Sequence, residues 1–355
     1  SVITSFVAFL LTLYGLFFVR SGIITSVHSF AFSRERGFYL FVICSILTFL
    51  AFAAFIGRKK ENYTSSKDNV ASVLTIRDKA IMGGNILWIT ALLSLFIAVI
   101  YPIYQSFFYE NNVAIDPEYF HQIFIPIFIP LMLIAAIIPY LNNHQSFSRK
   151  LIHLLIPFLI TLVIFHYIPK PGIISTAIIF ASTLLMIQMT NLFLIESNYF
   201  QKSLTPRKLS LIIGHFSLGL LAFSININVL FSKEIEFIGK TGESVSDEFF
   251  LVKLDNIRFS NTEVYYRQIA EFSVQDNNGN VVILKPENRL YKIENSLSQE
   301  TDIYSYLTHD MLASLSKVNG NTIHAIIYYK PMIWFIWLSI FLIAGSFVIY
   351  ITKVK

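Results

Sequence analysis

Long apolar runs alternate with short polar connections along most of the chain. A helix that spans a lipid bilayer needs about 20 mostly apolar residues, and eight segments approach or meet this requirement. None of them contains Lys or Arg, as expected where such a charge at mid-bilayer costs roughly 3 kcal/mol. The pattern predicts a polytopic α-helical membrane protein with about eight transmembrane helices, at residues 2–19, 37–57, 85–105, 120–141, 151–168, 173–195, 209–231 and 333–351.

The connection at residues 232–332 is too long and too polar to be a simple loop. Residues 248–259 and 264–274 are rich in β-branched and aromatic residues, which favours strands, and QDNNGN (275–280) predicts a hairpin turn. NTIHAIIYYK (321–330) predicts a last strand. Within 302–318 we expect a helix, because five apolar positions fall roughly on one helical face: Ile303, Tyr306, Leu307, Leu312 and Leu315.

The chain is therefore expected to have three parts. Residues 1–231 form a transmembrane bundle of seven helices, residues 232–332 form a small β-rich domain, and residues 333–355 form the last transmembrane helix with a short tail. The β-rich domain is thus inserted before the last helix.

The distribution of basic residues predicts the orientation. One set of connections, 58–84, 142–150, 196–208 and 352–355, carries 13 of the 27 Lys and Arg residues, whereas the opposite short connections carry 4. Basic residues are enriched in cytoplasmic loops, and long domains do not follow this bias. We therefore expect residues 20–36 and 232–332 to face the periplasm of a bacterium or the intermembrane space of a mitochondrion.

Composition agrees with a membrane protein and excludes other classes. Hydrophobic residues make up 55% of the 355 positions and charged residues 14%, against about 25% charged in a globular domain. The positive net charge is explained by topology and does not indicate nucleic-acid binding. Cys44 is the only cysteine, which excludes an intramolecular disulfide and a CxxC redox or zinc site. Because Ser1 stands directly on an apolar run, we expect the chain to begin partway through a longer protein or to be one piece of a split one.

Histidine is the main titratable group left at membrane depth. The near absence of charge in the spans argues against an ion-coupled transporter. His215 lies seven residues into the seventh span, beside the small residues Gly214, Ser217 and Gly219, which allow close approach of another helix or of a flat cofactor. Two alternatives stay open for His215: ligation of a metal or cofactor, and a hydrogen bond across a helix interface.

His28 lies in the connection RSGIITSVHSFAFSRERG (20–37), where function often concentrates. Arg20, Arg34 and Arg36 oppose the charge bias of that side, which suggests contact with lipid headgroups or a carboxylate-bearing ligand. For the other histidines we expect interfacial or solvated positions rather than ligation: His121, His144, His153, His166, His309 and His324.

Several segments, in the same order, resemble the CcmF family of cytochrome c maturation proteins. FLLTLYGLFFVRSGIITSVHSFAFSRERGFYLF (9–41) resembles the segment that follows the family's tryptophan-rich WWD region, and its VRSG…TSVHSFA stretch is the most specific. LIIGHFSLGLLAFS (211–224) resembles the family's span with an embedded histidine. Further similar segments are found at residues 75–102, 113–134, 281–291 and 330–347.

The resemblance implies a cytochrome c haem lyase component of system I. It implies that His28 is an axial ligand of haem at the outer face, held for thioether attachment to the CxxCH of apocytochrome c, and that His215 is an axial ligand of a transmembrane b-type haem. Arg20 or Arg34 would suit the haem propionates. No catalytic residue is assigned, and haem iron is the only metal expected.

The WWD region is missing, since the only tryptophans are Trp88, Trp334 and Trp337. The resemblance therefore implies partners: a WWD-containing upstream part or separate subunit, the haem chaperone, and apocytochrome c with its thiol-handling proteins. Localisation would be the bacterial or mitochondrial inner membrane.

Two other functions are possible from the sequence. One is a non-catalytic docking or assembly subunit that recruits apocytochrome or partner proteins through residues 232–332. The other is a transporter, which the lack of intramembrane charge and of inverted repeats disfavours.

Overall fold

The computed structural model divides the chain into two compact units, residues 1–128 and 129–355, and each is described by itself. The structure describes residues 6, 9–15, 17, 34–57, 75–109, 113, 115–140, 147–167, 172–199, 204–276, 279–292, 297–319 and 322–352.

The first unit contains α2 (Arg34–Gly57), α3 (Ile76–Tyr109) and the first half of α4 (Pro117–Ile137). Thr75 begins α3 with a reciprocal cap, because its hydroxyl accepts from the amide of Asp78 (3.2 Å) while its own amide donates to the Asp78 carboxylate (3.0 Å). Cys44 is buried on α2, and its thiol lies 3.8 Å from the carbonyl oxygen of Leu13.

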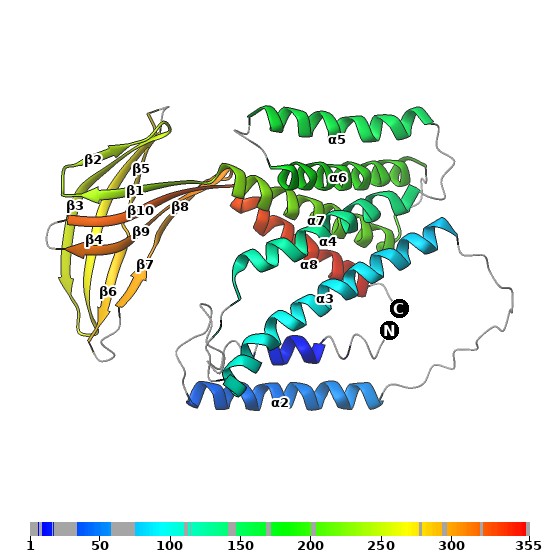
Figure 1. Ribbon diagram of the computed structural model, residues 1–355, viewed down its shortest axis with the longest axis horizontal. Helices are drawn as coiled ribbons and strands as arrows, with labels where there is room; N and C mark the ends of the chain where they lie inside the picture. The colour runs from blue at the N-terminus through cyan, green and yellow to red at the C-terminus, as the bar shows by residue number, and fades with distance from the viewer. Residues whose placement is uncertain are drawn as a thin grey trace. The chain divides into compact units, whose positions relative to one another are not determined.

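The second unit contains the rest of α4, a short 3₁₀ turn (Ile138–Tyr140), α5 (Phe147–Tyr167), α6 (Ile173–Tyr199), α7 (Pro206–Phe231) and α8 (Ile333–Thr352) (Figure 1). A core of buried apolar residues joins α4, α6 and α7, with Met132, Leu185 and Ile212 among them. Polar side chains also link neighbouring helices: the Ser210 hydroxyl donates to the carbonyl of Ser346 (2.7 Å), and the Asn226 amide donates to the carbonyl of Ser175 (3.0 Å).

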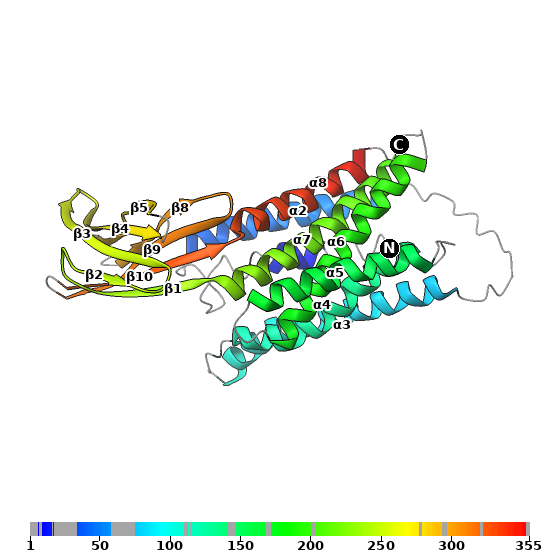
Figure 2. The same ribbon diagram turned by 90° about the horizontal axis from the view of Figure 1, so that it is seen from above.

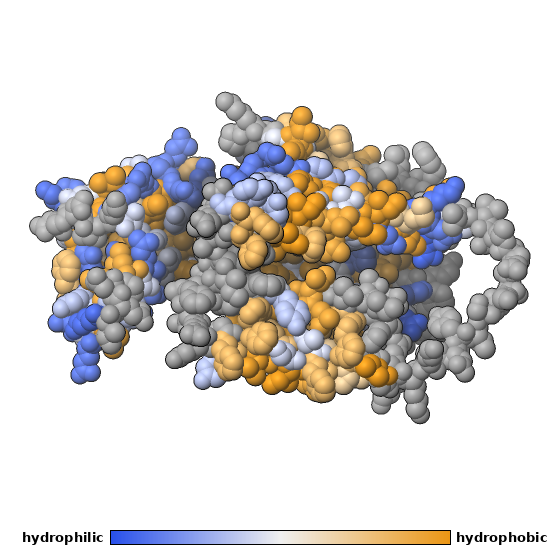
Figure 3. All heavy atoms as spheres, turned by 60° about the horizontal axis from the view of Figure 1, so that its bottom comes forward, coloured by the Kyte–Doolittle hydropathy of each residue, from blue (hydrophilic) through white to orange (hydrophobic). Residues whose placement is uncertain are grey.

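Five helices in the described part of the chain are long and apolar enough to cross a membrane, namely those at Ile76–Tyr109, Glu118–Ile137, Ile173–Ile195, Pro206–Phe231 and Ile333–Ile351. Phe38–Ala53 and Leu155–Tyr167 are shorter apolar helices. On the face that Figure 3 shows, hydrophobic side chains gather over the helices, whereas the β-rich part shows more hydrophilic ones. The predicted fold class, a polytopic helical membrane protein with a β-rich domain before the last helix, is confirmed. The count of eight spans stays a prediction.

The β-rich domain stands between α7 and α8 and consists of two antiparallel sheets (Figures 1 and 2). One sheet has the order β1-β10-β9-β8, and the other has the order β2-β3-β4-β6-β7, with β5 also paired to β4. The strands are β1 (Lys233–Gly239), β2 (Ser244–Ser246), β3 (Phe250–Asn261), β4 (Tyr265–Asp276), β5 (Val281–Leu284), β6 (Glu287–Tyr291), β7 (Leu297–Glu300), β8 (Asp302–Ser305), β9 (His309–Asn319) and β10 (Thr322–Pro331).

Alternate residues of these strands fill the core between the sheets, as the period of two requires. Phe237 on β1 meets Phe272 on β4 edge to face, with ring centroids 5.3 Å apart, and both rings are fully buried. The predicted turn at 275–280 is confirmed: the Asp276 carboxylate accepts from the amide of Asn280 (2.9 Å), and Gly279 takes a positive φ of 84°.

The predicted helix within residues 302–318 is wrong, because this segment forms β8, a turn and β9. Met311, Ala313 and Leu315 are buried at a spacing of two, which is the strand period. β9 pairs with β8 on one side and with β10 on the other, so its backbone groups form hydrogen bonds across strands and not along a helix. Of the five apolar positions that suggested a helix, only Leu315 is buried, and Ile303, Tyr306 and Leu307 are exposed. An apolar pattern over so short a stretch does not distinguish a helix from a strand.

Candidate functional site

His215 lies on α7, nine residues after Pro206, which is about 14 Å along the helix axis at about 1.5 Å per residue. Its side chain is half-buried, and its Nδ1 lies 2.9 Å from the carbonyl oxygen of Leu211. A carbonyl oxygen can only accept, so Nδ1 donates and, in the neutral imidazole, Nε2 keeps its lone pair. Nε2 is then the nitrogen that can ligate a metal, and the Nδ1 hydrogen bond orients the ring.

The small-residue face beside His215 is occupied by other helices. A Cβ atom on Gly214 would lie 3.1 Å from Oγ of Ser346 on α8, and one on Gly219 would lie 3.0 Å from the carbonyl oxygen of Ser182 on α6. Close helix approach, the first of the two uses predicted for these glycines, therefore accounts for them. His215 is turned about 100° around the helix axis from Gly214, away from the contact with Ser346.

His215 offers one imidazole nitrogen with which to hold a metal or a cofactor. No group of three or more His, Cys, Asp or Glu side chains suitable for a metal exists among the described residues. A haem iron takes four ligands from its porphyrin and needs only axial ligands from protein. A single imidazole with a free Nε2 fits one such axial position.

His28, the second predicted ligand, lies outside the described residues, as does Arg20. Of Arg34 only the backbone is described, at the start of α2. The pairing of these residues with an outer-face haem stays a prediction.

The remaining histidines lie apart from His215 in the chain and have simpler partners. His121 on α4 is exposed, 3.7 Å from the Glu118 carboxylate. His166 near the end of α5 is exposed beside the ring of Tyr167. His324 on β10 contacts the Glu236 carboxylate at 2.6 Å. His144 lies outside the described residues, and His153 is described only as part of α5.

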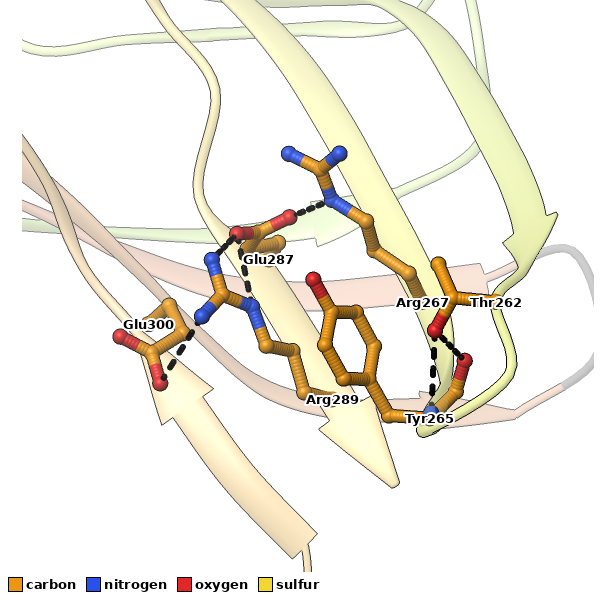
Figure 4. Close-up of polar contacts among 6 residues, drawn as sticks. All are labelled: Thr262, Tyr265, Arg267, Glu287, Arg289 and Glu300. Atoms are coloured by element: carbon orange, nitrogen blue, oxygen red, sulfur yellow. Dashed lines mark hydrogen bonds and ion pairs between the residues drawn. The ribbon is translucent and has the colours of Figure 1, made fainter. Parts of the chain in front are cut away.

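An ion cluster on the β-sandwich was not predicted from the sequence (Figure 4). The carboxylate of Glu287 accepts hydrogen bonds from Arg267 and Arg289, and Arg289 also lies 3.8 Å from the Glu300 carboxylate. Burial works to raise the pKa of Glu287, but the hydrogen bonds and charges of the two arginines outweigh it and hold that pKa below its usual range. The spacing Glu-x-Arg within β6 is the available signal, since residues two apart share a face of a strand.

A solvated or partner-facing role was expected for His309, and its imidazole lies between two tyrosine rings at the start of β9. The imidazole centroid is 4.6 Å from that of Tyr306 and 4.7 Å from that of Tyr329. Burial lowers the pKa of His309, although the charges of Asp310 and Asp276 oppose that change. The contacts indicate a packing role for this imidazole.

The chain is similar in sequence to proteins named for cytochrome c biogenesis. Residues 230–331 match the family model of the CcmF C-terminal beta-sandwich. The chain is 25% identical over 354 residues to the cytochrome c-type biogenesis protein CcmF of Haemophilus influenzae, covering 96% of this chain and 54% of that protein. It is 27% identical over 344 residues to the cytochrome c-type biogenesis protein NrfE of the same organism, covering 94% and 53%.

The chain spans about half the length of the curated relatives it matches. Among solved structures, one described as the cytochrome c heme lyase CcmF shares the fold, with a TM-score of 0.67 and 14% identity, covering 98% of this chain and 53% of that one. The predicted resemblance to the CcmF family is thus confirmed over nearly the whole chain. Together with the apolar helices, it identifies a multi-pass membrane protein.

Proposed function

We propose that this chain is the C-terminal part of a system I cytochrome c haem lyase and that it provides one axial histidine to each of two haems. His215 would ligate a b-type haem within the membrane, and His28 would ligate the haem that is attached to apocytochrome c. The observation that carries the proposal is the hydrogen bond from Nδ1 of His215 to the Leu211 carbonyl (2.9 Å), which leaves Nε2 free to bind iron. The relatives named for cytochrome c biogenesis support it.

In this proposal the chain's own residues position the cofactor, while the cofactor supplies the chemistry. Haem supplies the vinyl groups that become thioether bonds and an iron that can carry electrons. The Leu211 carbonyl holds the His215 ring in one tautomer and one orientation. The α6 and α8 contacts at Gly219 and Gly214 fix α7, and with it the position of the imidazole.

The arrangement across the membrane is part of the same proposal. The loop at 20–36 and the β-sandwich would face the periplasm or intermembrane space, as the distribution of basic residues favours. His28 would then lie at that face, where a haem chaperone delivers its cargo and apocytochrome c presents its CxxCH. The WWD-containing part would complete both ligand pairs.

The test compares His215→Ala, His28→Ala and the control His166→Ala in cells whose cytochrome c maturation depends on this protein. We expect His215→Ala to abolish the b-haem optical spectrum of the purified, assembled protein. We expect His28→Ala to keep that spectrum but to block formation of holocytochrome c. His166→Ala, which removes an exposed histidine near the end of α5, should change neither.

An unchanged b-haem spectrum in His215→Ala would contradict its role as ligand. A normal yield of holocytochrome c from both variants would instead favour a docking role for the domain at 232–332, with no haem ligand in this chain.

A further inference from the structure

The point at which the chain leaves the β-sandwich for the membrane is well defined. β10 ends at Pro331 and α8, a candidate membrane span, begins at Ile333, so only Met332 lies between them. Met332 has a positive φ of 65°, which no other non-glycine residue shows in the described part of the chain. The chain therefore changes from strand to membrane-spanning helix at this one residue, which lies at the membrane end of the sandwich.

The turn between β8 and β9 lies beside Met332, at the same end of the sandwich. The amide of Met332 donates to the carbonyl of Thr308 (2.8 Å), and His309 is the strand partner of Pro331. Because this hydrogen bond and the strand pairing tie the turn to the residues directly before the span, the turn lies close to the membrane surface. Figure 1 shows β8 and β9 reaching toward the start of α8.

Aromatic and apolar side chains are exposed in this turn and in the adjacent strand β8. Tyr304 is 47% exposed, Tyr306 36% and Leu307 60%. Trp334 and Trp337 on the first turns of α8 are also exposed. Tyrosine and tryptophan concentrate where a bilayer meets water, because their rings are apolar and their polar atoms still reach water.

Two further observations favour a lipid as the contact. The ring of His309 is stacked on that of Tyr306 and tilted against that of Tyr329. These contacts hold the turn in place, so inserting the turn requires little further ordering of the chain. Lys330 at this end of the sandwich pairs with the Glu234 carboxylate (3.6 Å). Lys233, the strand partner of Tyr329, adds a further positive charge there, and anionic headgroups attract such a charge.

We propose that the β8–β9 turn, with Tyr304, Tyr306 and Leu307, inserts into the headgroup region of the bilayer beside α8 and ties the β-sandwich to the membrane surface. The occupant of this surface is lipid. The inference depends on α8 being a membrane span and is independent of haem ligation.

The test places a nitroxide label in the full chain, reconstituted in nanodiscs of phosphatidylcholine and phosphatidylglycerol. Cys44, the only cysteine, is first replaced by alanine. The label is then attached at Leu307→Cys or at the matched control Ile238→Cys, since both side chains are 60% exposed. Ile238 lies five residues beyond Lys233 along β1, about 17 Å farther along the strand at about 3.3 Å per residue.

We expect the ratio of collision rates with oxygen, which concentrates in lipid, to those with a water-soluble nickel chelate to be several-fold higher at position 307 than at 238. Equal ratios at the two positions would overturn the proposal. Tyr304→Cys provides the same comparison if the label at 307 prevents reconstitution. A ratio at 304 that equals the ratio at 238 would then overturn it as well.

Discussion

Glu287 lies between two guanidinium groups on the β-sandwich (Figure 4). Arg267 on β4 and Arg289 on β6 are direct strand partners, so their like charges would repel each other. The Glu287 carboxylate, only 8% exposed, accepts hydrogen bonds from both. At the residue scale this contact offsets the repulsion and stabilises the pairing of β4 with β6.

We expect Glu287→Gln to destabilise the sandwich by about 2 kcal/mol, since hydrogen bonds to charged groups are worth roughly this much. The loss of stability would be measured as faster hydrogen exchange of the β4 and β6 amides in the full chain. Glu234→Gln removes an exposed ion pair with Lys330 (3.6 Å). This substitution should change the free energy of opening, obtained from the exchange rates, by less than about 1 kcal/mol. Equal effects of the two substitutions would argue against a special role for Glu287.

The effect of Glu287 should also depend on pH. Its pKa is lower in the folded chain than the unfolded value of about 4.5. Its contribution is therefore fully present above that value and is lost as the pH falls through the folded pKa. The difference in exchange between the native chain and Glu287→Gln should thus shrink below about pH 4.

At the scale of the secondary-structure elements, the contact between α6 and α7 determines the position of α7 and therefore of His215. A Cβ on Gly219 would lie 2.9 Å from Cγ of Met186 and 3.0 Å from the backbone oxygen of Ser182. The methionine side chain can move, but the backbone oxygen cannot without shifting the helix. α7 therefore approaches α6 this closely because position 219 has no side chain.

We expect Gly219→Ala to lower the thermal stability of the reconstituted chain, at a cost of roughly 1–3 kcal/mol, because it overpacks this contact. Gly345→Ala on α8 is the matched control, since a Cβ there meets nothing within 4 Å. It should be neutral or slightly stabilising, because alanine favours a helix over glycine by about 1 kcal/mol. A stable Gly219→Ala variant would show that α6 and α7 can separate without loss.

The molecule as a whole carries its β-sandwich between two adjacent helices. The amide of Asn228 near the end of α7 donates to the carbonyl of Pro331, the last residue of β10 (2.6 Å). α7 and α8 therefore enter and leave the sandwich side by side. The proposed orientation places the sandwich on one side of the membrane and the start of α7 on the other.

Single cysteines in the Cys44→Ala background test this orientation. A membrane-impermeant maleimide should label Ile238→Cys on the sandwich in spheroplasts of a bacterial host. It should label Thr205→Cys, exposed before α7, only after the membrane is disrupted, since that site would face the cytoplasm. The reverse pattern would invert the proposed topology.

The sequence by itself determined the membrane class, the place of the β-rich insert and the candidate ligand His215. The free energy of transfer from water to lipid is a property of each residue in an apolar run. A membrane span can therefore be detected without any knowledge of tertiary contacts. The turn at 275–280 was predictable for the same reason, because its geometry is local.

Only the tertiary structure decided the conformation of residues 302–318, where pairing with β10 overrode an ambiguous apolar pattern. It also decided that Gly214 and Gly219 face helices, that Arg267 meets Glu287 across 20 positions, and that the turn at Leu307 lies beside the start of α8. These facts depend on contacts between residues distant in the chain, which a periodicity along one segment does not contain.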